Sequence, residues 1–330
     1  MSRTPRMLAG LVAGSALLAA AACGSGSAQT SGQTSSQSSS QSSSSDPDGR
    51  PAVVAAIYPL QWLSEQVGGP DAAVSVLTAP GVEPHDLELG AQQVAQLQNA
   101  ALTVYVKGVQ PAVDEAVTPE TSFDAATAVT TLPAGEDAHA HEEDAAHGHE
   151  EGEQAHDHEG EAADPHIWLD PSRLATVATK LGERLAAADP AHAQGYKDRA
   201  ARTASALTAL DQEFSKGLAT CTTRTMVTAH AAFGYLADRY KLQQVGITLD
   251  PEQEPSPARL AQVATAAKNA KVTTIFTEAL VNPKVAEVLA SEVGARTAVL
   301  DPLESKPSGD YPSAMRDNLK SLQTALGCTA

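Results

Sequence analysis

The sequence has few cysteines, and none of them stands in a spacing typical of a metal site. The 330 residues contain only Cys23, Cys221 and Cys328, with no CxxC or CxxH pair. No cysteine-ligated metal is therefore indicated. An exported protein with two remaining cysteines favours a disulfide bond. We predict one between Cys221 and Cys328; two buried free thiols are the alternative.

The motifs of common hydrolases and nucleotide-binding enzymes are also missing. There is no HExxH, no GxSxG and no P-loop. His141 and Glu142 begin a zinc-protease string, but Ala145 stands where the second histidine is needed. We predict that the protein is not an enzyme, with a zinc hydrolase as the rival reading.

Lysine and arginine are scarce relative to acidic residues. The chain has 22 basic and 40 acidic residues, for a net charge of -18. Such a balance argues against a nucleic-acid partner, because phosphate binding needs a basic surface. Twelve of the acidic residues fall between Glu136 and Asp164, where no lysine or arginine occurs. Most of the excess charge is therefore local.

Only one apolar run approaches the length of a membrane span, and it lies at the start of the chain. Residues 7–22 are apolar, follow Arg3 and Arg6, and end at Cys23. The run is short for a membrane helix and is typical of a secretory signal. Its end, LAAAACG, resembles a bacterial lipobox. We predict a signal peptide over residues 1–22 and a lipidated Cys23; an ordinary cleaved signal is the alternative.

Two segments lack the apolar residues needed for a core. Residues 23–50 are dominated by Ser, Gln, Gly and Thr, which predicts a disordered tether because nothing offsets its ordering entropy. Residues 135–163 form an acidic, Gly- and Ala-rich loop without apolar periodicity. This loop contains six histidines: His139, His141, His147, His149, His156 and His158. We expect them to form an auxiliary metal collector; an inert linker is the alternative.

The rest of the chain alternates short β-branched runs with helical ones. Expected strands are 52–57, 73–78, 102–106, 128–132, 225–228, 244–248, 272–276 and 297–300. Expected helices are 60–67, 91–100, 111–117, 171–188, 191–216, 232–240, 257–270, 283–293 and 311–326. Such alternation predicts an α/β fold of parallel sheets flanked by helices.

The alternation occurs twice, which predicts two lobes. The N-terminal α/β lobe spans residues 51–170, including the loop at 135–163, and the C-terminal lobe spans residues 220–330. Between them, residues 171–219 read as linking helices. The segment 191–216 would extend about 40 Å, so we expect a long rigid helix that joins both lobes, with a metal site in the cleft between them.

Outside the histidine-rich loop only four histidines remain: His85, His166, His192 and His230. His85 and His230 follow expected strands, as does Asp301. Ligands of parallel sheets bind beyond the carboxyl ends of the strands. Imidazole and carboxylate are ligands that zinc accepts. The three imidazoles of His85, His166 and His230 would favour zinc over manganese. His192 is expected on a helix surface.

Longer motifs carry a resemblance to a known family. They are PH at 84–85 followed by Glu88, DPHIWLDP at 164–171, VTAHAAFGY at 227–235, PEQEPS at 251–256, FTE at 276–278 and LDPL at 300–303. With these motifs in this order, residues 53–326 resemble the metal-specific solute-binding proteins of ABC importers, the cluster that handles zinc and manganese.

The resemblance implies a site and a function. The family's metal ligands fall on His85, His166, His230 and Asp301. Manganese members tend to carry Glu in place of His230, so the resemblance points to Zn²⁺. Glu278 matches a family acid that either hydrogen-bonds a ligand or supports the fold.

The implied protein is a monomeric zinc-binding lipoprotein on the outer face of the cytoplasmic membrane. It would capture extracytoplasmic Zn²⁺ and deliver it to the membrane permease of an ABC importer, which works with a cytoplasmic ATPase. A manganese- or copper-binding homologue and a surface adhesin are the alternatives.

Overall fold

The computed structural model describes residues 49–135 and 163–329. The predicted signal peptide, the lipidation site at Cys23 and the tether up to residue 48 lie outside the described residues. So do the six histidines expected to collect metal.

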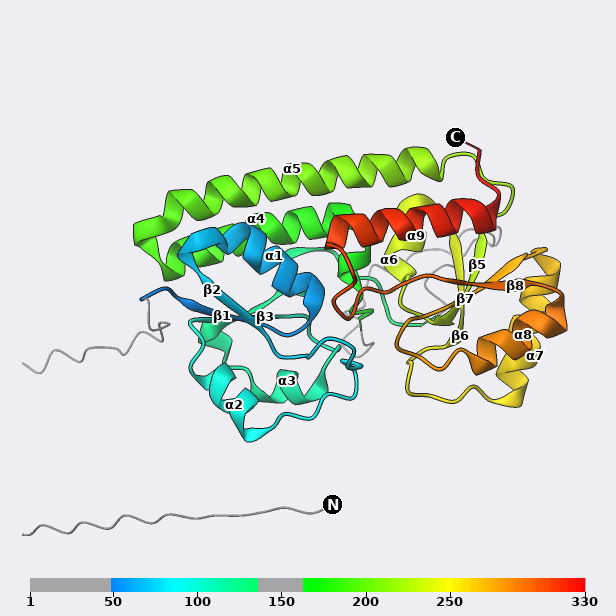
Figure 1. Cartoon of the computed structure of the whole chain (residues 1–330), viewed down its shortest axis with the longest axis horizontal. Coiled ribbons are helices and arrows are strands. Elements are labelled where there is room, and N and C mark those ends of the chain that lie inside the picture. Colours follow the sequence, from blue (N-terminus) through cyan, green and yellow to red (C-terminus); the bar gives the residue numbers. More distant parts are fainter. Residues whose placement is uncertain (1–48, 136–162, 330) are drawn as a thin grey trace, which may run out of the picture. The chain divides into compact units, whose positions relative to one another are not determined.

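The described residues form two four-stranded sheets, each entirely parallel (Figure 1). The first, in the order β2-β1-β3-β4, contains β1 (Ala52–Ala55), β2 (Ala73–Val76), β3 (Leu102–Tyr105) and β4 (Ser122–Asp124). The second, in the order β6-β5-β7-β8, contains β5 (Thr225–His230), β6 (Gln243–Thr248), β7 (Thr274–Thr277) and β8 (Arg296–Val299). The predicted pair of parallel α/β lobes is confirmed.

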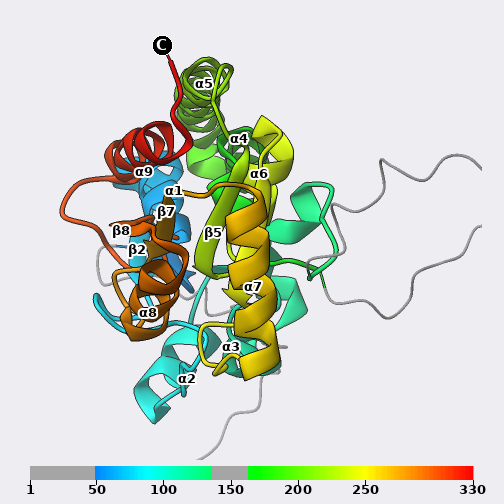
Figure 2. The same cartoon turned by 90° about the vertical axis from the view of Figure 1, so that its right-hand side faces the viewer.

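Helices cover both faces of each sheet. Those of the first lobe are α1 (Tyr58–Gly68), α2 (Ala91–Gln98) and α3 (Pro111–Ala116). The linking helices are α4 (Pro171–Ala188) and α5 (Ala193–Gly217). Those of the second lobe are α6 (Gly234–Tyr240), α7 (Pro257–Asn269), α8 (Lys284–Val293) and α9 (Tyr311–Leu326). Helices α7 and α8 lie on one face of the second sheet, and α6 and α9 on the other (Figure 2).

Strand β1 shows why these runs become buried strands. Val53 and Ala55 face the main core beneath α1, α4 and α5, whereas Val54 and Ala56 face a smaller core beneath α2 and α3. Successive side chains of a strand point to opposite faces. A strand with helices on both sides must therefore be apolar throughout rather than alternating.

Helix α5 connects the two lobes, as predicted. At its N-terminal half, Arg199 donates to the carbonyl oxygens of Val67 and Gly68 at the end of α1. At its C-terminal half, Glu213 accepts two hydrogen bonds from Arg316 of α9. With 25 residues, the helix extends about 38 Å. Helix α5 is thus hydrogen-bonded to both lobes.

Helix and chain ends follow local chemistry. Asp170 caps α4 by accepting from the backbone N–H groups of Ser172 and Arg173, as short acidic side chains do at helix starts.

The predicted disulfide between Cys221 and Cys328 is confirmed; it joins the chain before β5 to the residue after the Gly327 cap of α9. Among the described residues, no helix combines the length and apolarity needed to cross a membrane.

The strand predicted at 128–132 is wrong. The fourth strand of the first sheet is β4, at Ser122–Asp124, and a 3-10 turn follows at Ala125–Ala128. Leu132 instead accepts a hydrogen bond from the backbone of Asp164 and donates its own N–H to the hydroxyl of Tyr235 in α6. Strand propensity depends on context, and here β4 occupies the sheet edge beside β3.

Candidate metal centre

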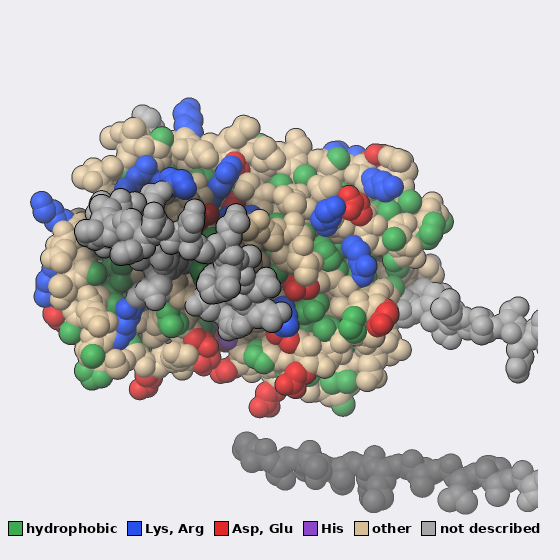
Figure 3. Space-filling model, turned by 180° about the vertical axis from the view of Figure 1, so that it is seen from behind, with side chains coloured by type: hydrophobic (Ala, Val, Ile, Leu, Met, Phe, Trp, Pro, Cys, Tyr) green, Lys and Arg blue, Asp and Glu red, His purple; other side chains and the backbone are tan. Residues whose placement is uncertain are grey.

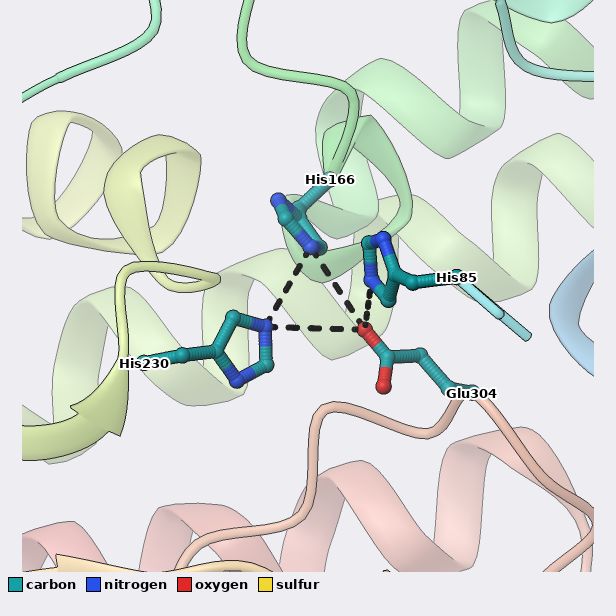
Figure 4. Close-up of side chains that lie close together, drawn as sticks. All are labelled: His85, His166, His230 and Glu304. Carbon is teal, nitrogen blue, oxygen red and sulfur yellow. Dashed lines mark hydrogen bonds and ion pairs between the residues drawn. The ribbon is translucent and has the colours of Figure 1, made fainter. Parts of the chain in front are cut away.

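The side chains of three histidines and one glutamate point toward one another and form one group (Figure 4). Each offers one potential ligand atom, and these atoms all lie within 4.8 Å of one another. The four residues are His85, from the loop between β2 and α2, His166, from the segment before α4, His230, at the end of β5, and Glu304, from the turn between β8 and α9. No ligand pair comes from neighbouring positions in the sequence.

The spacing of these atoms suits one small cation. Oε1 of Glu304 lies 3.2 Å from Nε2 of His85, 3.5 Å from Nε2 of His166 and 3.7 Å from Nε2 of His230. The Nε2 atoms of His166 and His230 are 3.5 Å apart. Ligands of a tetrahedral zinc ion at about 2.0–2.1 Å stand about 3.4 Å from one another. These four separations are close to those of a zinc coordination sphere, and all of the ligand atoms lie within 4.8 Å of one another.

Three of the four residues of the centre are buried. His230 and Glu304 are 0% and 1% exposed, and His166 is 4% exposed. The side chain of His85 is 12% exposed, which makes this residue the open side of the centre. Figure 3 shows acidic side chains gathered near the lower edge of one face of the molecule. The acidic residue Asp86 directly follows His85 in the sequence, and negative charge near an opening favours the approach of cations.

Two buried carboxylates orient two of the histidines. Oδ1 of Asp164 accepts from Nδ1 of His166 at 2.8 Å and from the backbone N–H of the same residue at 3.0 Å. Oε2 of Glu278 accepts from Nδ1 of His230 at 2.7 Å, and its Oε1 accepts from the His230 backbone N–H at 3.0 Å. A proton held on Nδ1 leaves Nε2 free for a metal. Glu278 thus lies beside a histidine, outside the group of four.

The pKa values of the centre reflect its crowded charges. Burial alone would raise the pKa of Glu304, but hydrogen bonds from His166 and His85 hold it well below its usual range. Burial lowers the pKa of His166, yet Asp164 and Glu304 outweigh that and raise it to about 10. Burial, with the charge of Glu304, raises the pKa of Glu83 to about 7. The metal-free centre therefore holds protons that a metal must displace.

One residue of the expected ligand set lies outside this group. Asp301 does not join the group of four; its Oδ1 accepts the N–H of Leu303 at 2.8 Å. Glu304 stands in its place, three residues along the same turn. The sequence favours Asp301 because it directly follows the expected strand 297–300 and lies within the LDPL motif, whereas Glu304 is the first residue after that motif.

His192 lies away from the centre, near the surface as expected. It ends the 3-10 turn Pro190–His192 between α4 and α5, and its Nδ1 pairs with Asp189 at 2.7 Å. The hydrogen bond to Asp189 raises the pKa of His192. Among the described residues, the centre with Glu304 is the one group of metal-binding side chains with this spacing.

A family model and curated relatives match most of the chain. Residues 53–325 match the model described as "Zinc-uptake complex component A periplasmic". The "Zinc-binding lipoprotein AdcA" of Streptococcus pneumoniae serotype 4 is 36% identical over 289 residues, which cover 84% of this chain and 56% of that protein. The chain thus spans about half the length of this relative. The "High-affinity zinc uptake system protein ZnuA" of Bacillus subtilis is 33% identical over 287 residues, covering 83% of this chain and 87% of that protein.

A solved structure has the same fold. The laminin-binding protein Lmb of Streptococcus agalactiae superposes with a TM-score of 0.72 at 30% identity, over 84% of this chain and 99% of that one. Its structure is described as that of a bifunctional protein with adhesin and metal transporting activity.

Proposed function

Because this chain belongs to the family of zinc-uptake component A, whose members are solute-binding proteins of transport systems, we propose that it captures Zn²⁺ outside the cytoplasm and delivers it to an importer. The observation that carries the proposal is the buried group of three imidazoles and one carboxylate with zinc-like spacing. Zinc is here the transported substrate.

The chemistry of capture follows from the ligand types. His85, His166 and His230 would bind zinc through neutral Nε2 atoms, and Glu304 would supply one negative oxygen. Asp164 and Glu278 hold protons on the opposite ring nitrogens, so the lone pairs face the centre. Binding would release protons from His166, because a charged imidazole cannot ligate metal.

The donor set favours zinc over the alternatives. Manganese prefers more oxygen ligands than one carboxylate provides. Copper suits imidazole and remains a rival in vitro. Four protein ligands also fill a tetrahedral shell, whereas catalytic zinc keeps an open position for water. That supports a carrier rather than an enzyme.

Release would require the two lobes to separate slightly. His85 belongs to the first lobe, while His230 and Glu304 belong to the second, so even a small tilt would break the shell. Helix α5 is fastened to both lobes, and we expect it to keep that tilt small. An importer permease, acting with its ATPase, would receive the metal.

The proposed location and assembly rest on the sequence. A lipidated Cys23 would anchor a monomer to the outer face of the cytoplasmic membrane, and the pneumococcal relative is named a lipoprotein. The histidine-rich segment would act as an auxiliary collector that is weaker than the buried centre. The second candidate function is adhesion, because the structure of the streptococcal protein is described as that of an adhesin as well as a metal transporter. Adhesion would not depend on the metal ligands.

The test compares single variants of the centre with a matched histidine outside it. The protein isolated without added metal should contain one zinc per chain by elemental analysis. We expect His166→Ala, His230→Ala and Glu304→Ala each to weaken zinc binding by orders of magnitude in chelator competition, and His192→Ala to leave it unchanged. Unaltered affinity in the three centre variants would refute the proposed site. Laminin binding that survives in these variants would support the adhesin role.

A further inference from the structure

The turn that carries Glu304 contains a buried residue in a costly backbone conformation. Leu303 has φ of 60° and is completely buried. Among the described residues, the other non-glycine residues with positive φ are Lys241 and Lys271, which follow the ends of α6 and α7. The left-handed conformation costs about 1–2 kcal/mol for a residue with a side chain. Surrounding contacts must therefore hold Leu303 in place.

Contacts from distant parts of the chain hold this turn. Asp301 Oδ1 accepts the N–H of Leu303 at 2.8 Å. Asn318 of α9, which is buried, accepts from the Asp301 N–H at 2.9 Å and donates to the Asp301 carbonyl at 2.6 Å. The indole N–H of Trp168 donates to the carbonyl of Pro302 at 2.7 Å. Side-chain contacts thus occupy the backbone of three successive residues.

The same contacts fix the turn relative to the rest of the centre. Trp168 stands two residues after His166, and the two rings lie 5.2 Å apart. The segment that presents His166 is therefore bonded directly to the turn that presents Glu304. After the turn, Ser305 accepts the N–H of Gly81 at 2.6 Å, four residues before His85. Contacts from both lobes therefore fix the position of the turn that carries Glu304.

We propose that Asp301 is a positioning residue, whose side-chain oxygen holds the turn at Leu303 and thereby directs Glu304 to the three imidazoles. The inference rests on the proposed zinc function. It assigns Asp301 a hydrogen-bond role and requires no charge on it and no bond to metal. A residue that only accepts one N–H can be replaced by another acceptor, whereas a carboxylate ligand cannot.

The experiment separates these roles by conservative exchange. Asp301→Asn keeps an oxygen for the Leu303 N–H, Asp301→Ala removes it, and Asn318→Ala removes the clamp on the Asp301 backbone. Asp317→Ala, an exposed acid on α9, is the charge-matched control. Each protein is titrated with zinc by chelator competition and loaded with Co²⁺, whose visible spectrum reports the ligand shell. Metal-free thermal unfolding measures stability separately.

We expect Asp301→Ala and Asn318→Ala to bind zinc about 10–100-fold more weakly and to give the Co²⁺ spectrum of Glu304→Gln. Asp301→Asn and Asp317→Ala should stay close to the unmodified protein. A loss in Asp301→Asn as large as in Glu304→Gln would make Asp301 a ligand and overturn the inference. Full affinity in Asn318→Ala and Asp301→Ala would also overturn it, and if Asp301→Ala does not fold, Asp301→Asn and Asn318→Ala decide. Full affinity in His230→Ala would instead refute the zinc site itself.

Discussion

The carboxylate of Glu278 provides the sharpest test of how the centre is built. It makes two hydrogen bonds to one residue, at 2.7 Å to Nδ1 of His230 and at 3.0 Å to the His230 backbone N–H. Both side chains are nearly inaccessible to solvent. Replacing Glu278 by Gln keeps the shape and one acceptor oxygen but turns the other oxygen into an amide donor. If that amide faces Nδ1, the imidazole proton moves to Nε2, where zinc must bind.

The expected cost follows from that tautomer change. Outer partners of metal-binding histidines contribute about 10–100-fold to affinity, which corresponds to about 1.4–2.7 kcal/mol. Glu278→Gln should therefore weaken zinc binding by that factor, less than the loss of His230 itself. Glu278→Ala should also leave the backbone N–H and the Nδ1–H of His230 buried without a partner. The free energy of unfolding of the metal-free protein should therefore fall by about 1–3 kcal/mol.

The assays are zinc competition against a chelator at fixed pH and denaturant unfolding of the metal-free protein. Glu287→Gln, on the exposed side of α8, is the matched control and should change neither quantity. Unchanged affinity in both Glu278 variants would refute the tautomer argument. A loss in Glu278→Gln equal to that of His230→Ala would show that Glu278 binds the metal directly.

Further outcomes are expected for the disulfide, for the dependence on pH and for Gly234. Replacing Cys221 and Cys328 by Ser opens a cross-link over 107 positions, and denaturant unfolding should show a loss of about 4–5 kcal/mol; an unchanged midpoint would contradict this. The raised pKa of His166, about 10, stabilises the metal-free fold fully below pH 6.5, and this stability is lost as pH rises toward 10. Zinc affinity should rise over the same range, by about tenfold per pH unit for one proton, which competition titrations at several pH values would check. A Cβ at Gly234 would overlap Oδ2 of Asp164, so Gly234→Ala should weaken zinc binding, and an unaltered affinity would mean that Asp164 relaxes without moving His166.

Much of the fold was readable from local sequence. Runs such as 225–228 and 297–300 are short and β-branched, and they alternate with long helical segments, which predicts parallel sheets without reference to contacts. Three ligand candidates were also readable. Histidines are rare outside one acidic segment, and His85 and His230 follow strands whose carboxyl ends must meet at one edge. The fourth strand was misplaced because 128–132 has the better strand composition, while Ser122–Asp124 has the better place beside β3.

The choice between Asp301 and Glu304 belongs to the tertiary structure. Both are carboxylates on one short turn after β8, and their residue types suit zinc equally well. Leu303, which lies between them in the sequence, has the left-handed backbone conformation. Local propensity disfavours that conformation for leucine, and contacts from Trp168 and Asn318, far away in the sequence, accompany it. The sequence by itself predicted the three histidines and named Asp301 as the fourth ligand. In the structure Glu304 lies beside the imidazoles instead, on a turn that hydrogen bonds from Trp168 and Asn318 hold in a conformation that local preference disfavours, and no local pattern could show those bonds.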